Sequence, residues 1–487
     1  MTKKRDAVFS CLITCLLAVA PQAVLAEMHD DQSRPNILFV AVDDMKPMTG
    51  WYGVDTVRTP TFDRLASEST VFTAAYTQYP VCGPSRASLL TGLRPEVSGV
   101  MDLKTRMRDI HPDILTLPQF FKNHGYQTAA AGKIFDPRNV DSRDDDDPVS
   151  WTIPYQQSLP GADRKLDVNF AVRAIDAPAE RFIDGAINAR GISLMRKMAA
   201  EPSPFFLAVG YKKPHLPFAV PKGFFDLYDP SSFGLEAWQT APEGSDASYI
   251  LMDNNEMRSY VPTPGPDGVQ RDYSAEGMTP AQQRELIHGY HAAVSFIDSL
   301  LAELLKELEA TGQADNTIIV LWGDHGFHLG DHGMWGKHTT MEQANRVPMM
   351  IHVPGKKAGY ASTLVELMDL FPTLAGLSGL KAPANLQGKD LAPVLDDPEL
   401  DLGDVAISQY KRRGAYGYSM RTQGYRYTEW VMPDGRVAYR DLYDMQEDPG
   451  ETRNIGALPE NLELMDTLGA LLRENGAGLE RLRGAGT

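Results

Sequence analysis

Short apolar runs that end abruptly at charged or polar residues constrain the fold of this chain more than any other feature. A run that is apolar at nearly every position is typical of a strand buried on both faces of a parallel sheet. Segments with helical spacing separate these runs, and the alternation predicts an α/β fold with a mostly parallel sheet and helices on both faces. The predicted strands are 36–42, 126–133, 204–211, 316–326 and 348–355.

The helical segments carry their own start and stop signals. Proline in a first turn is typical of a helix start, and glycine after the last periodic residue is typical of a helix end. Two polar segments, 141–148 and 262–268, are predicted to be loops, and the four aspartates of 144–147 favour a solvated acidic loop over a cation site. The predicted helices are 59–69, 84–93, 116–125 and the long amphipathic segment 279–308.

The pattern changes past about residue 400. Short runs rich in aromatic and β-branched residues follow one another there, and they predict an antiparallel meander with a hairpin turn at Asp434-Gly435. An amphipathic helix over 460–475 is expected to close this lobe. The chain has 487 residues, so we expect a catalytic domain over 27–400 and a C-terminal α+β subdomain over 401–487.

The N-terminal segment 1–26 has the form of a secretory signal peptide. Lys3, Lys4 and Arg5 precede an apolar segment, 8–20, and a stretch of small residues ends at Ala26. The apolar segment is short for a bilayer, so we expect cleavage after Ala26 and export to the periplasm or the exterior. A retained membrane anchor is the alternative, although no other segment predicts stable membrane insertion.

The net charge is strongly negative. The formal net charge is −17, and because the segment 1–26 holds two more basic than acidic side chains, the chain without it is near −19. Such a protein repels nucleic acids and acidic membranes at long range, so we expect no nucleic-acid partner. An anionic substrate would need a local positive pocket or a bound metal.

One cysteine stands alone in the expected mature chain. Of three cysteines, Cys11 and Cys15 leave with the signal peptide, so Cys82 has no disulfide partner, which is unusual for an exported protein. Cys82 precedes a predicted helix, where free backbone N–H groups and the helix dipole stabilise negative charge. An inert buried thiol is one interpretation and a chemical role is the other; a thiol nucleophile would need a histidine from elsewhere in the chain.

Charged side chains follow four of the predicted strands. Ligands of open α/β sheets bind beyond the carboxyl ends of the strands, so we expect these side chains to converge on one site. Its three carboxylates favour calcium or magnesium. The four histidines of 324–338 make zinc the competing interpretation, although their spacing lacks the H-E-x-x-H pattern. The residues concerned are Asp43, Asp44, Lys133, Lys213, His215, Asp324 and His325.

The segment around Cys82 resembles the signature of the type I, formylglycine-dependent sulfatases. CGPSRASLLTG (82–92) has C-x-P-S-R followed by a small-residue helix and T-G, and Pro84, Ser85 and Arg86 all match. The resemblance implies an alkaline-phosphatase-like fold and a cysteine that is oxidised to formylglycine during export, whose hydrate is the nucleophile. Further similar blocks, closest to the iduronate-2-sulfatase branch, are 34–47, 129–135, 210–218, 323–338, 419–430 and 442–454.

The resemblance also implies a role for each matched residue. One calcium ion would be bound by residue 82 and four side chains at strand ends, and Arg86 would hold the formylglycine hydrate. One hydroxyl of the hydrate would attack sulfur and release the alcohol, and the other would then expel sulfate and restore the aldehyde. The implied metal ligands are Asp43, Asp44, Cys82, Asp324 and His325. The implied catalytic residues are Cys82, Arg86, Lys133 and Lys337 on the sulfate oxygens, and His215 on the sulfate and the leaving oxygen.

One position departs from the family. Three residues after Lys133 the family often has a histidine that assists the formylglycine, whereas this chain has Asp136. An aspartate can accept a proton or hydrogen-bond the hydrate, but it also adds negative charge near the sulfate. The assignment of that role, and with it the substrate, is therefore open.

These observations predict a sulfuric ester hydrolase that acts on a sulfated carbohydrate and depends on a formylglycine-generating maturation enzyme. Two alternatives are a phosphodiester or phosphonate monoester hydrolase on the same fold and a non-catalytic glycan-binding homologue. Loops 141–165 and 230–275 are expected to shape the pocket and to select the sugar. His328, His332 and His338 are further candidates for the pocket lining.

Overall fold

The computed structural model of the chain describes residues 34–140, 146–156, 159–166, 170–250, 255–260, 278–403, 405–476 and 478–483. The predicted signal peptide lies outside these residues. Within them, no helix combines the length and the apolar character that crossing a membrane requires.

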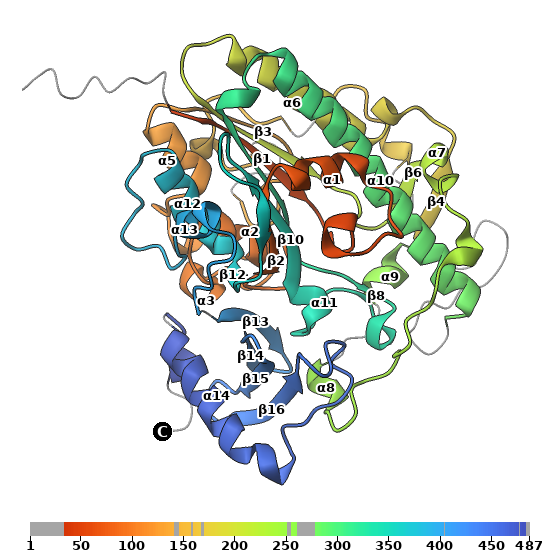
Figure 1. Ribbon diagram of the computed structural model, residues 1–487, viewed down its shortest axis with the longest axis vertical. Coiled ribbons are helices and arrows are strands. Elements are labelled where there is room, and N and C mark those ends of the chain that lie inside the picture. The colour runs from red at the N-terminus through yellow and green to blue at the C-terminus, as the bar shows by residue number, and fades with distance from the viewer. Residues whose placement is uncertain are drawn as a thin grey trace, which may run out of the picture.

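An eight-stranded sheet forms the centre of the molecule (Figure 1). Its strand pairs are parallel except the two made by β10 (Arg346–His352), which is antiparallel to both of its neighbours. The predicted mostly parallel sheet is confirmed, and it also contains β2 (Thr70–Tyr76), which is not among the predicted strands. The order is β11 (Gly359–Ala361), β2 (Thr70–Tyr76), β10, β7 (Thr317–Gly323), β1 (Asn36–Val42), β5 (Phe205–Tyr211) and β3 (Gln127–Gly132), with β12 (Val365–Glu366) beside β2.

The register of the central parallel strands brings their carboxyl ends to one edge of the sheet. Val42, the last residue of β1, lies opposite Tyr211 of β5 and Gly323 of β7. Gly132, the last residue of β3, lies opposite Gly210 of β5. Gly132 has a φ of +79°, and a Cβ there would come within 2.2 Å of the Gly210 carbonyl oxygen, so this close approach requires glycine. The residues that follow these strands therefore emerge side by side.

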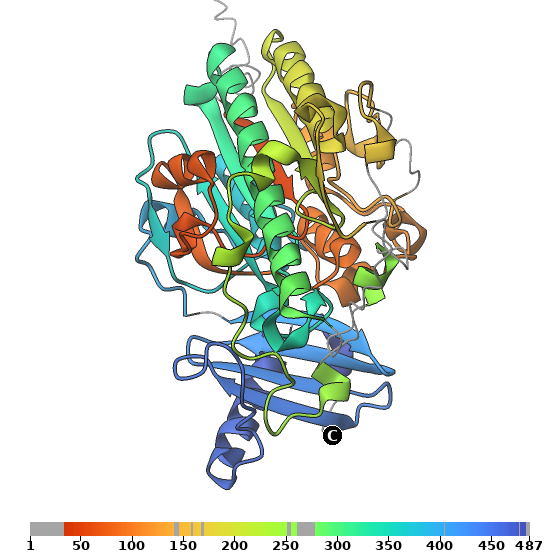
Figure 2. The same cartoon turned by 90° about the vertical axis from the view of Figure 1, so that its right-hand side faces the viewer.

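Two hydrophobic cores cover the two faces of the sheet. Successive residues of β1 point to opposite faces, and both sets are buried. Burial of each large apolar side chain contributes about 1.5–3 kcal/mol. Figures 1 and 2 show the helices on both sides of the sheet, as predicted. One core includes residues of α1 (Pro60–Ser67), α6 (Ile183–Ala199) and α10 (Pro280–Ala310); the other includes residues of α2 (Cys82–Thr91), α5 (Leu117–Asn123), α12 (Leu370–Leu377) and α13 (Ala392–Asp396).

Local sequence signals explain where the main helices begin. α10 starts with a capping box between Thr279 and Gln282, with Pro280 in its first turn. The Thr116 side chain accepts a backbone hydrogen bond at the start of α5. α2 begins at Cys82, slightly before its predicted start. The remaining short elements are α3 (Pro95–Ser98), α4 (Met107–Ile110), β4 (Val172–Ile175), β6 (Phe218–Pro221), α7 (Lys222–Phe225), α8 (Ala247–Ile250), α9 (Asn255–Ser259), β8 (His328–Leu329), β9 (Trp335–Gly336), α11 (Glu342–Asn345) and α15 (Glu480–Arg483).

The C-terminal lobe is an antiparallel meander covered by one helix, as predicted. Its strands pair in chain order. Met465, Leu468 and Leu472 of α14 (Leu462–Asn475) pack in the same core as apolar residues of the sheet. The strands are β13 (Ala406–Arg412), β14 (Ala415–Arg421), β15 (Tyr425–Val431) and β16 (Val437–Asp444).

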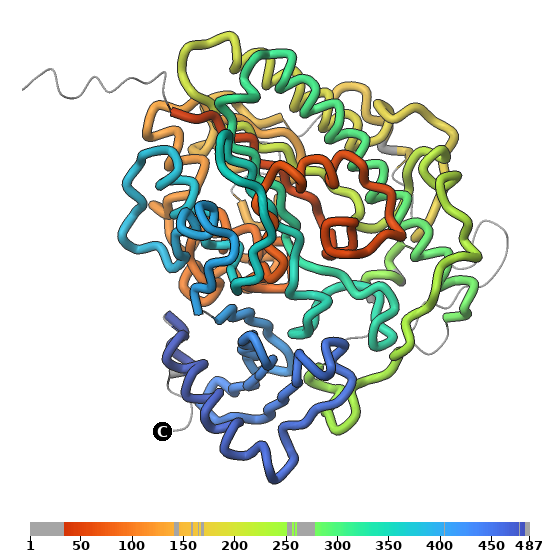
Figure 3. The backbone as a smooth tube through the Cα atoms, in the orientation of Figure 1, coloured from red at the N-terminus to blue at the C-terminus, as the bar shows by residue number. Residues whose placement is uncertain are grey.

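β13, the first strand of this lobe, makes hydrogen bonds to the segment that precedes α2. Ser408 Oγ donates a hydrogen bond to the Thr77 carbonyl (2.5 Å), and Gln409 N donates one to the Gln78 carbonyl (2.8 Å). The backbone of α8 also lies beside the lobe (Figure 3). Aromatic rings of α8 and β16 stack there, with centroids 5.2 Å apart. The C-terminal lobe is therefore joined to the main sheet by specific polar contacts close to Cys82.

The acidic loop corrects one expectation. The sequence favours solvated aspartates over 144–147, but the two that are described, Asp146 and Asp147, are buried. Asp147 accepts hydrogen bonds from Arg108 Nε (2.6 Å) and Nη2 (2.8 Å) and from Ser150 Oγ (2.5 Å). A buried carboxylate is tolerated when it is paired in this way, and the arginine partner lies too far along the chain to be recognised from the sequence.

Candidate active site

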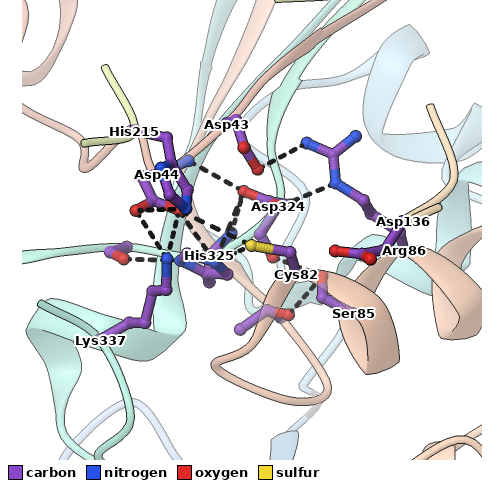
Figure 4. Close-up of polar contacts among 12 residues, drawn as sticks. Asp43, Asp44, Cys82, Ser85, Arg86, Asp136, His215, Asp324, His325 and Lys337 are labelled. Atoms are coloured by element: carbon purple, nitrogen blue, oxygen red, sulfur yellow. Dashed lines mark hydrogen bonds and ion pairs between the residues drawn. The ribbon is translucent and has the colours of Figure 1, made fainter. Parts of the chain in front are cut away.

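The residues at the carboxyl edge of the sheet surround Cys82 (Figure 4). Cys82 Sγ lies 3.2 Å from His325 Nε2 and 3.8 Å from Asp44 Oδ1. The predicted metal ligands are all buried and they converge. One ligand atom from each residue lies within 4.8 Å of the others in two overlapping groups, Cys82 with Asp324 and His325, and Cys82 with Asp43, Asp44 and His215.

The signature around Cys82 is explained by packing at the start of α2. Gly83 faces Asn139, and a Cβ at this glycine would lie 2.0 Å from Asn139 Oδ1, so no larger residue fits there without rearrangement. Ser85 Oγ accepts a hydrogen bond from Thr77 Oγ1 (2.9 Å) and donates one to the Asp324 carbonyl. The serine of the signature thus ties α2 to the end of β7.

Arg86 links the carboxylates of the cluster and is fully buried. Its Nε donates to Asp324 Oδ2 (2.8 Å), and its Nη2 donates to Asp43 Oδ1 (3.1 Å). Its Nη1 donates to the Lys133 carbonyl (2.5 Å). Burial alone would lower the pKa of Arg86, but the charges of Asp324 and Asp43 raise it above the usual value. Arg86 is therefore a permanent buried cation, and it fixes the carboxylates of two strand ends.

Two lysines contact the other side of the same carboxylates. Lys133 Nζ lies 2.7 and 2.9 Å from the Asp43 oxygens, and Lys337 Nζ lies 2.7 and 2.9 Å from the Asp44 oxygens. Burial would raise the pKa of Asp43, but Lys133 and then Arg86 hold it well below the usual value. For Asp44 burial would likewise raise the pKa, but His215 and Lys337 outweigh it. Both carboxylates are ionised at neutral pH.

The two histidines of the site have defined orientations. His325 Nδ1 lies 2.9 Å from the Gly326 carbonyl and His215 Nδ1 lies 2.6 Å from the Leu216 carbonyl. A carbonyl oxygen only accepts, so Nδ1 carries a proton in both rings, and Nε2 faces the cluster. A backbone carbonyl on one ring nitrogen is the usual support for a metal-binding Nε2 on the other. His325 Nε2, 3.2 Å from Asp44 Oδ1, satisfies this condition.

The donor set suits a hard divalent cation. Three buried carboxylates and one imidazole make the site rich in oxygen, as calcium or magnesium requires. Of the four histidines in 324–338, only His325 belongs to a potential ligand group among the described residues. His328 is buried and bonds Thr339 Oγ1 (2.7 Å), and His332 packs against His328. The histidine-rich segment thus does not converge as a zinc site would.

As a thiol, Cys82 would be a poor nucleophile at this position. Burial raises its pKa well above the usual value, and the negative charge of Asp43 acts in the same direction. The thiolate that nucleophilic cysteines need is therefore disfavoured. This environment agrees with a role for residue 82 that does not depend on its thiol.

Glu256 of α9 is a site residue that no sequence signal indicated. Its Oε1 lies 3.0 Å from Lys337 Nζ and 3.3 Å from His215 Nε2. Its Oε2 lies 3.7 Å from His338 Nε2. Burial would raise the pKa of Glu256, but Lys337 and then His338 and His215 hold it well below the usual value. A carboxylate thus bridges two of the predicted sulfate-binding groups.

Asp136 lies beside the cluster and pairs with Arg138. It is buried, with 1% of its surface exposed, and accepts hydrogen bonds from Arg138 Nε (2.8 Å) and Nη2 (2.7 Å). Lys133 Nζ lies 3.7 Å from its Oδ2. Burial would raise its pKa, but the hydrogen bonds from Arg138 and the charge of Lys133 hold it well below the usual value. Asp136 is therefore an ionised partner of Arg138 next to the site.

A cavity of about 470 Å³ opens beside the cluster. Both loops that the sequence indicated contribute to it, through Asp146, Tyr155 and Leu159 from one and Tyr260 from the other. Its polar lining is dominated by ionisable side chains. These are Asp43, Lys133, Asp136, Arg138, Asp146, Lys212, Lys213 and His215.

Comparisons with known proteins agree with this geometry. Residues 35–380 match the family model described as Sulfatase, and residues 330–477 match the one described as N-sulphoglucosamine sulphohydrolase, C-terminal. The chain is 33% identical to iduronate 2-sulfatase of Homo sapiens, over 86% of this chain and 90% of the relative. It is 31% identical to a sulfatase of Formosa agariphila, over 96% of this chain and 91% of the relative.

Solved structures share the fold at lower identity. A protein in complex with its substrate D-glucosamine-2-N,6-O-disulfate has a TM-score of 0.74 at 24% identity, over 92% of this chain and 98% of the other. The phosphonate monoester hydrolase of Agrobacterium radiobacter has a TM-score of 0.71 at 22% identity, over 91% and 96%. The alkaline-phosphatase-like fold is thereby confirmed. The family match and the identity to curated relatives over most of the chain mean that it belongs to the sulfatase family and is itself a sulfatase.

Proposed function

We propose that this sulfatase removes a sulfate ester from a sulfated sugar, as an iduronate-2-sulfatase-like enzyme with one calcium ion and formylglycine at residue 82. The observation that carries the proposal is the placement of Cys82 at one sheet edge, against a buried carboxylate cluster that two lysines also contact. The curated relatives named iduronate 2-sulfatase support the sugar as substrate. The predicted division into residues 27–400 and 401–487 remains part of the proposal.

Five side chains would hold the calcium ion: Asp43, Asp44, Asp324, His325 and residue 82 itself. The ion, when bound, would supply a fixed positive charge that offsets the negative charge developing on the sulfate oxygens. Arg86 contributes to the same site without a ligand bond, because it pairs with Asp43 and Asp324 and reduces their mutual repulsion. Oxygen-rich donors are the basis for choosing calcium over zinc.

Residue 82 would supply the nucleophile once its thiol has been converted to formylglycine, whose hydrate provides a hydroxyl group. The first turn of α2 presents this residue to the carboxylate cluster, and the N-terminal backbone N–H groups of a helix stabilise negative charge. Lys133 and Lys337 would exchange their aspartate partners for the oxygens of the sulfate. These lysines supply the local positive charge that an acidic protein needs to bind an anion.

His215 would hold the proton that the leaving alcohol needs. Its Nδ1 is fixed by the Leu216 carbonyl, so a proton on Nε2 points at the pocket. Glu256 and Asp44 lie 3.3 and 4.0 Å from Nε2, so two carboxylates flank the nitrogen that would carry this proton. The ring is thus oriented for general acid catalysis at the bridging oxygen.

Export after signal-peptide removal and maturation by a formylglycine-generating enzyme complete the proposal. Phosphonate or phosphodiester hydrolysis is the alternative, since phosphonate monoester hydrolases share the fold. A decayed, glycan-binding homologue is disfavoured because every matched catalytic side chain is present and oriented toward the site.

One experiment tests the proposal directly. Protein with formylglycine verified by mass spectrometry at residue 82 is assayed against sulfated mono- and disaccharides and against matched phosphate and phosphonate esters. We expect release of sulfate from at least one sugar with a higher kcat/KM than for any phosphorus ester. A higher kcat/KM for a phosphodiester or phosphonate would support the alternative, and binding without turnover would support the decayed homologue.

A further inference from the structure

Arg138 is an ordered cation on the wall of the cavity, next to the predicted sulfate site. Its side chain is 41% exposed, while the carboxylate that holds it, Asp136, is fully buried. Arg138 lines the cavity together with Lys133. None of the proposed steps of sulfate hydrolysis uses this arginine, so its fixed position needs another explanation.

Asp136 occupies only one edge of the guanidinium. Arg138 Nε and Nη2 donate to the two oxygens of Asp136 in a bidentate pair. A guanidinium has a second bidentate edge, formed by Nη1 and Nη2. Among the described residues, none accepts a hydrogen bond from Nη1 of Arg138. This second edge has the geometry to bind a planar carboxylate or the oxygens of a sulfate.

Several hydrogen bonds fix the turn that carries Asp136 and Arg138. Asn139 N donates to the Asp136 carbonyl (2.9 Å), which closes the turn. Asn139 Nδ2 donates to the carbonyls of Asp102 (2.9 Å) and Thr105 (2.7 Å). The backbone of Arg138 also donates to Asp136 Oδ1 (3.0 Å). Little conformational freedom is left to lose when a ligand binds, which favours affinity.

The separation from the sulfate site suits a single sugar. Lys133 Nζ and Arg138 Nη2 contact the same oxygen of Asp136, at 3.7 and 2.7 Å. Because Lys133 Nζ and Arg138 Nη2 both lie close to this one oxygen, the distance between the two nitrogens is at most the sum of these two distances. Two substituents of one sugar ring, or of adjoining positions on neighbouring rings, span a comparable distance.

The acidic residue Asp146 on the cavity wall does not oppose a second anion. Its Oδ2 has no hydrogen-bond partner among the described residues. Burial, and next the charge of Asp147, raise its pKa to about 8, so the carboxyl keeps its proton at neutral pH. A protonated carboxyl can donate a hydrogen bond to an anion, whereas an ionised one would repel it.

We propose that the second edge of Arg138 is an additional anion-binding subsite, so that the enzyme selects sugars with two negative groups, the ester sulfate and either a uronic carboxylate or a second sulfate. Asp136, at the position where the family often has histidine, is the positioning residue of this subsite. This inference rests on the proposed sulfatase activity toward sugars. It assigns the unusual aspartate to substrate selection and not to proton transfer with residue 82.

Two pairs of substrates distinguish the sources of the second charge. The first pair is a sulfated uronic acid and its carboxamide, and the second is a disulfated and a monosulfated hexosamine. We expect a kcat/KM preference of about 10- to 100-fold for the doubly charged member of at least one pair, carried mainly by KM. The pair that shows the preference identifies the natural second group.

Arg138→Met is expected to abolish this preference and to leave kcat for the singly charged member within about twofold. The control is Arg196→Met on α6, which breaks a similar bidentate pair with Glu307 (2.7 and 2.6 Å) outside the cavity lining and should keep the preference. Asp136→Asn should reduce the preference through KM, whereas a merely structural role would lower activity on both members equally. A preference that persists in Arg138→Met, or no preference in either pair, would overturn the subsite.

A binding measurement separates this inference from the proposed function. The wild type and Arg138→Met are titrated calorimetrically with the sulfate-free uronic acid and with the monosulfated hexosamine that carries only the second sulfate. We expect at least a tenfold weaker Kd in Arg138→Met for one of them. If no substrate is hydrolysed but the wild type and Arg138→Met still differ in Kd, the proposed function fails and the subsite stands. If a sulfated sugar is hydrolysed but the two proteins have equal Kd values, the subsite fails and the proposed function stands.

Discussion

Two sides of the active site differ in how they are built. The residues of the metal-facing side follow strands in parallel register or begin helix α2, and their side chains are buried and paired. The residues of the loop side belong to loops and to the short helix α9, and these segments share no strand register. Under the proposed function, the residues at the sheet edge would carry out the chemistry, and the loop residues would select what binds beside them. The metal-facing side is Asp43, Asp44, Cys82, Asp324 and His325; the loop side is Asp136, Arg138, Asp146 and Glu256.

The two sides also differ in protonation. On the metal-facing side, lysines, Arg86 and His215 outweigh burial, and Asp43 and Asp44 have lowered pKa values. On the loop side Asp146 is buried beside another carboxylate and its pKa rises to about 8. One side is therefore prepared to bind a cation, and part of the other side is neutral near an expected anion.

The largest effect is expected from removal of the proposed nucleophile on the metal-facing side. Cys82→Ala should lower kcat on any sulfate ester on the order of 10⁴- to 10⁶-fold, because removal of a nucleophile leaves only binding and electrostatic effects. Sulfate release is the measurement, and the far-UV spectrum and thermal midpoint check that the fold is retained. Activity within tenfold of the matured wild type would exclude residue 82 as nucleophile.

Metal binding provides the next test of that side. Calcium at about 100 times its Kd should add about 2.7 kcal/mol to the free energy of unfolding, and a chelator should remove it. Asp44→Asn should lose most of this increment, because it removes one ligand charge at the centre of the cluster. Asp226→Asn, a change at an exposed ion pair with Lys222 of α7, is the matched control. Stabilisation by zinc but not by calcium would contradict the oxygen-rich assignment.

A smaller effect is expected on the loop side at Glu256. Its carboxylate lies 3.0 Å from Lys337 Nζ, a group that would also bind the sulfate under the proposed function, so the two anions would compete for it. Glu256→Gln should lower KM for a small aryl sulfate about three- to tenfold, since a neutral amide binds ammonium more weakly than a carboxylate does. Steady-state kinetics measure this change. A raised KM would instead indicate that Glu256 assists substrate binding.

The smallest effect is a pH dependence of stability from Asp146. Its folded pKa of about 8 lies above the usual value of 3.8, so between about pH 4 and pH 8 the folded protein keeps a proton that the unfolded chain has lost. Stability from this group is thus lost as pH rises through that window. Asp146→Asn should reduce the fall in thermal midpoint between pH 5 and pH 8.5 by about 2 °C. Asp113→Asn, at an exposed site, should leave the fall unchanged.

The metal-facing side was predictable because its residues directly follow recognisable strands. Asp43 and Asp324 come after runs that are buried at every position, and parallel pairing then brings them together without any knowledge of the loops. β2 escaped prediction because TVFTAAY mixes threonine and alanine with few large apolar residues. The edge strand order and the antiparallel direction of β10 depend on long-range pairing that a single run does not encode.

The loop side was only partly predictable for a related reason. The departure at Asp136 was visible, but its partner Arg138 became clear only when the turn closed by Asn139 placed both side chains. Asp147 looked solvated because its partner Arg108 is distant in the sequence. Glu256 had no signal, since its contacts come from two segments that are also distant. Loop positions depend on many weak contacts, and sequence periodicity does not report them.

The contact between β13 and the segment before Cys82 has a consequence for biosynthesis. A chain made from its N-terminus presents Cys82 long before β13 emerges, because β13 belongs to the C-terminal lobe. Until then the carbonyls of Thr77 and Gln78 lack the partners that fix them in the folded protein. The Ser85 hydroxyl likewise lacks its acceptor, the Asp324 carbonyl, until that part of the chain has been made. Cys82 is 1% exposed when folding is complete, so this delay would leave it accessible to the proposed formylglycine-generating enzyme before the fold closes.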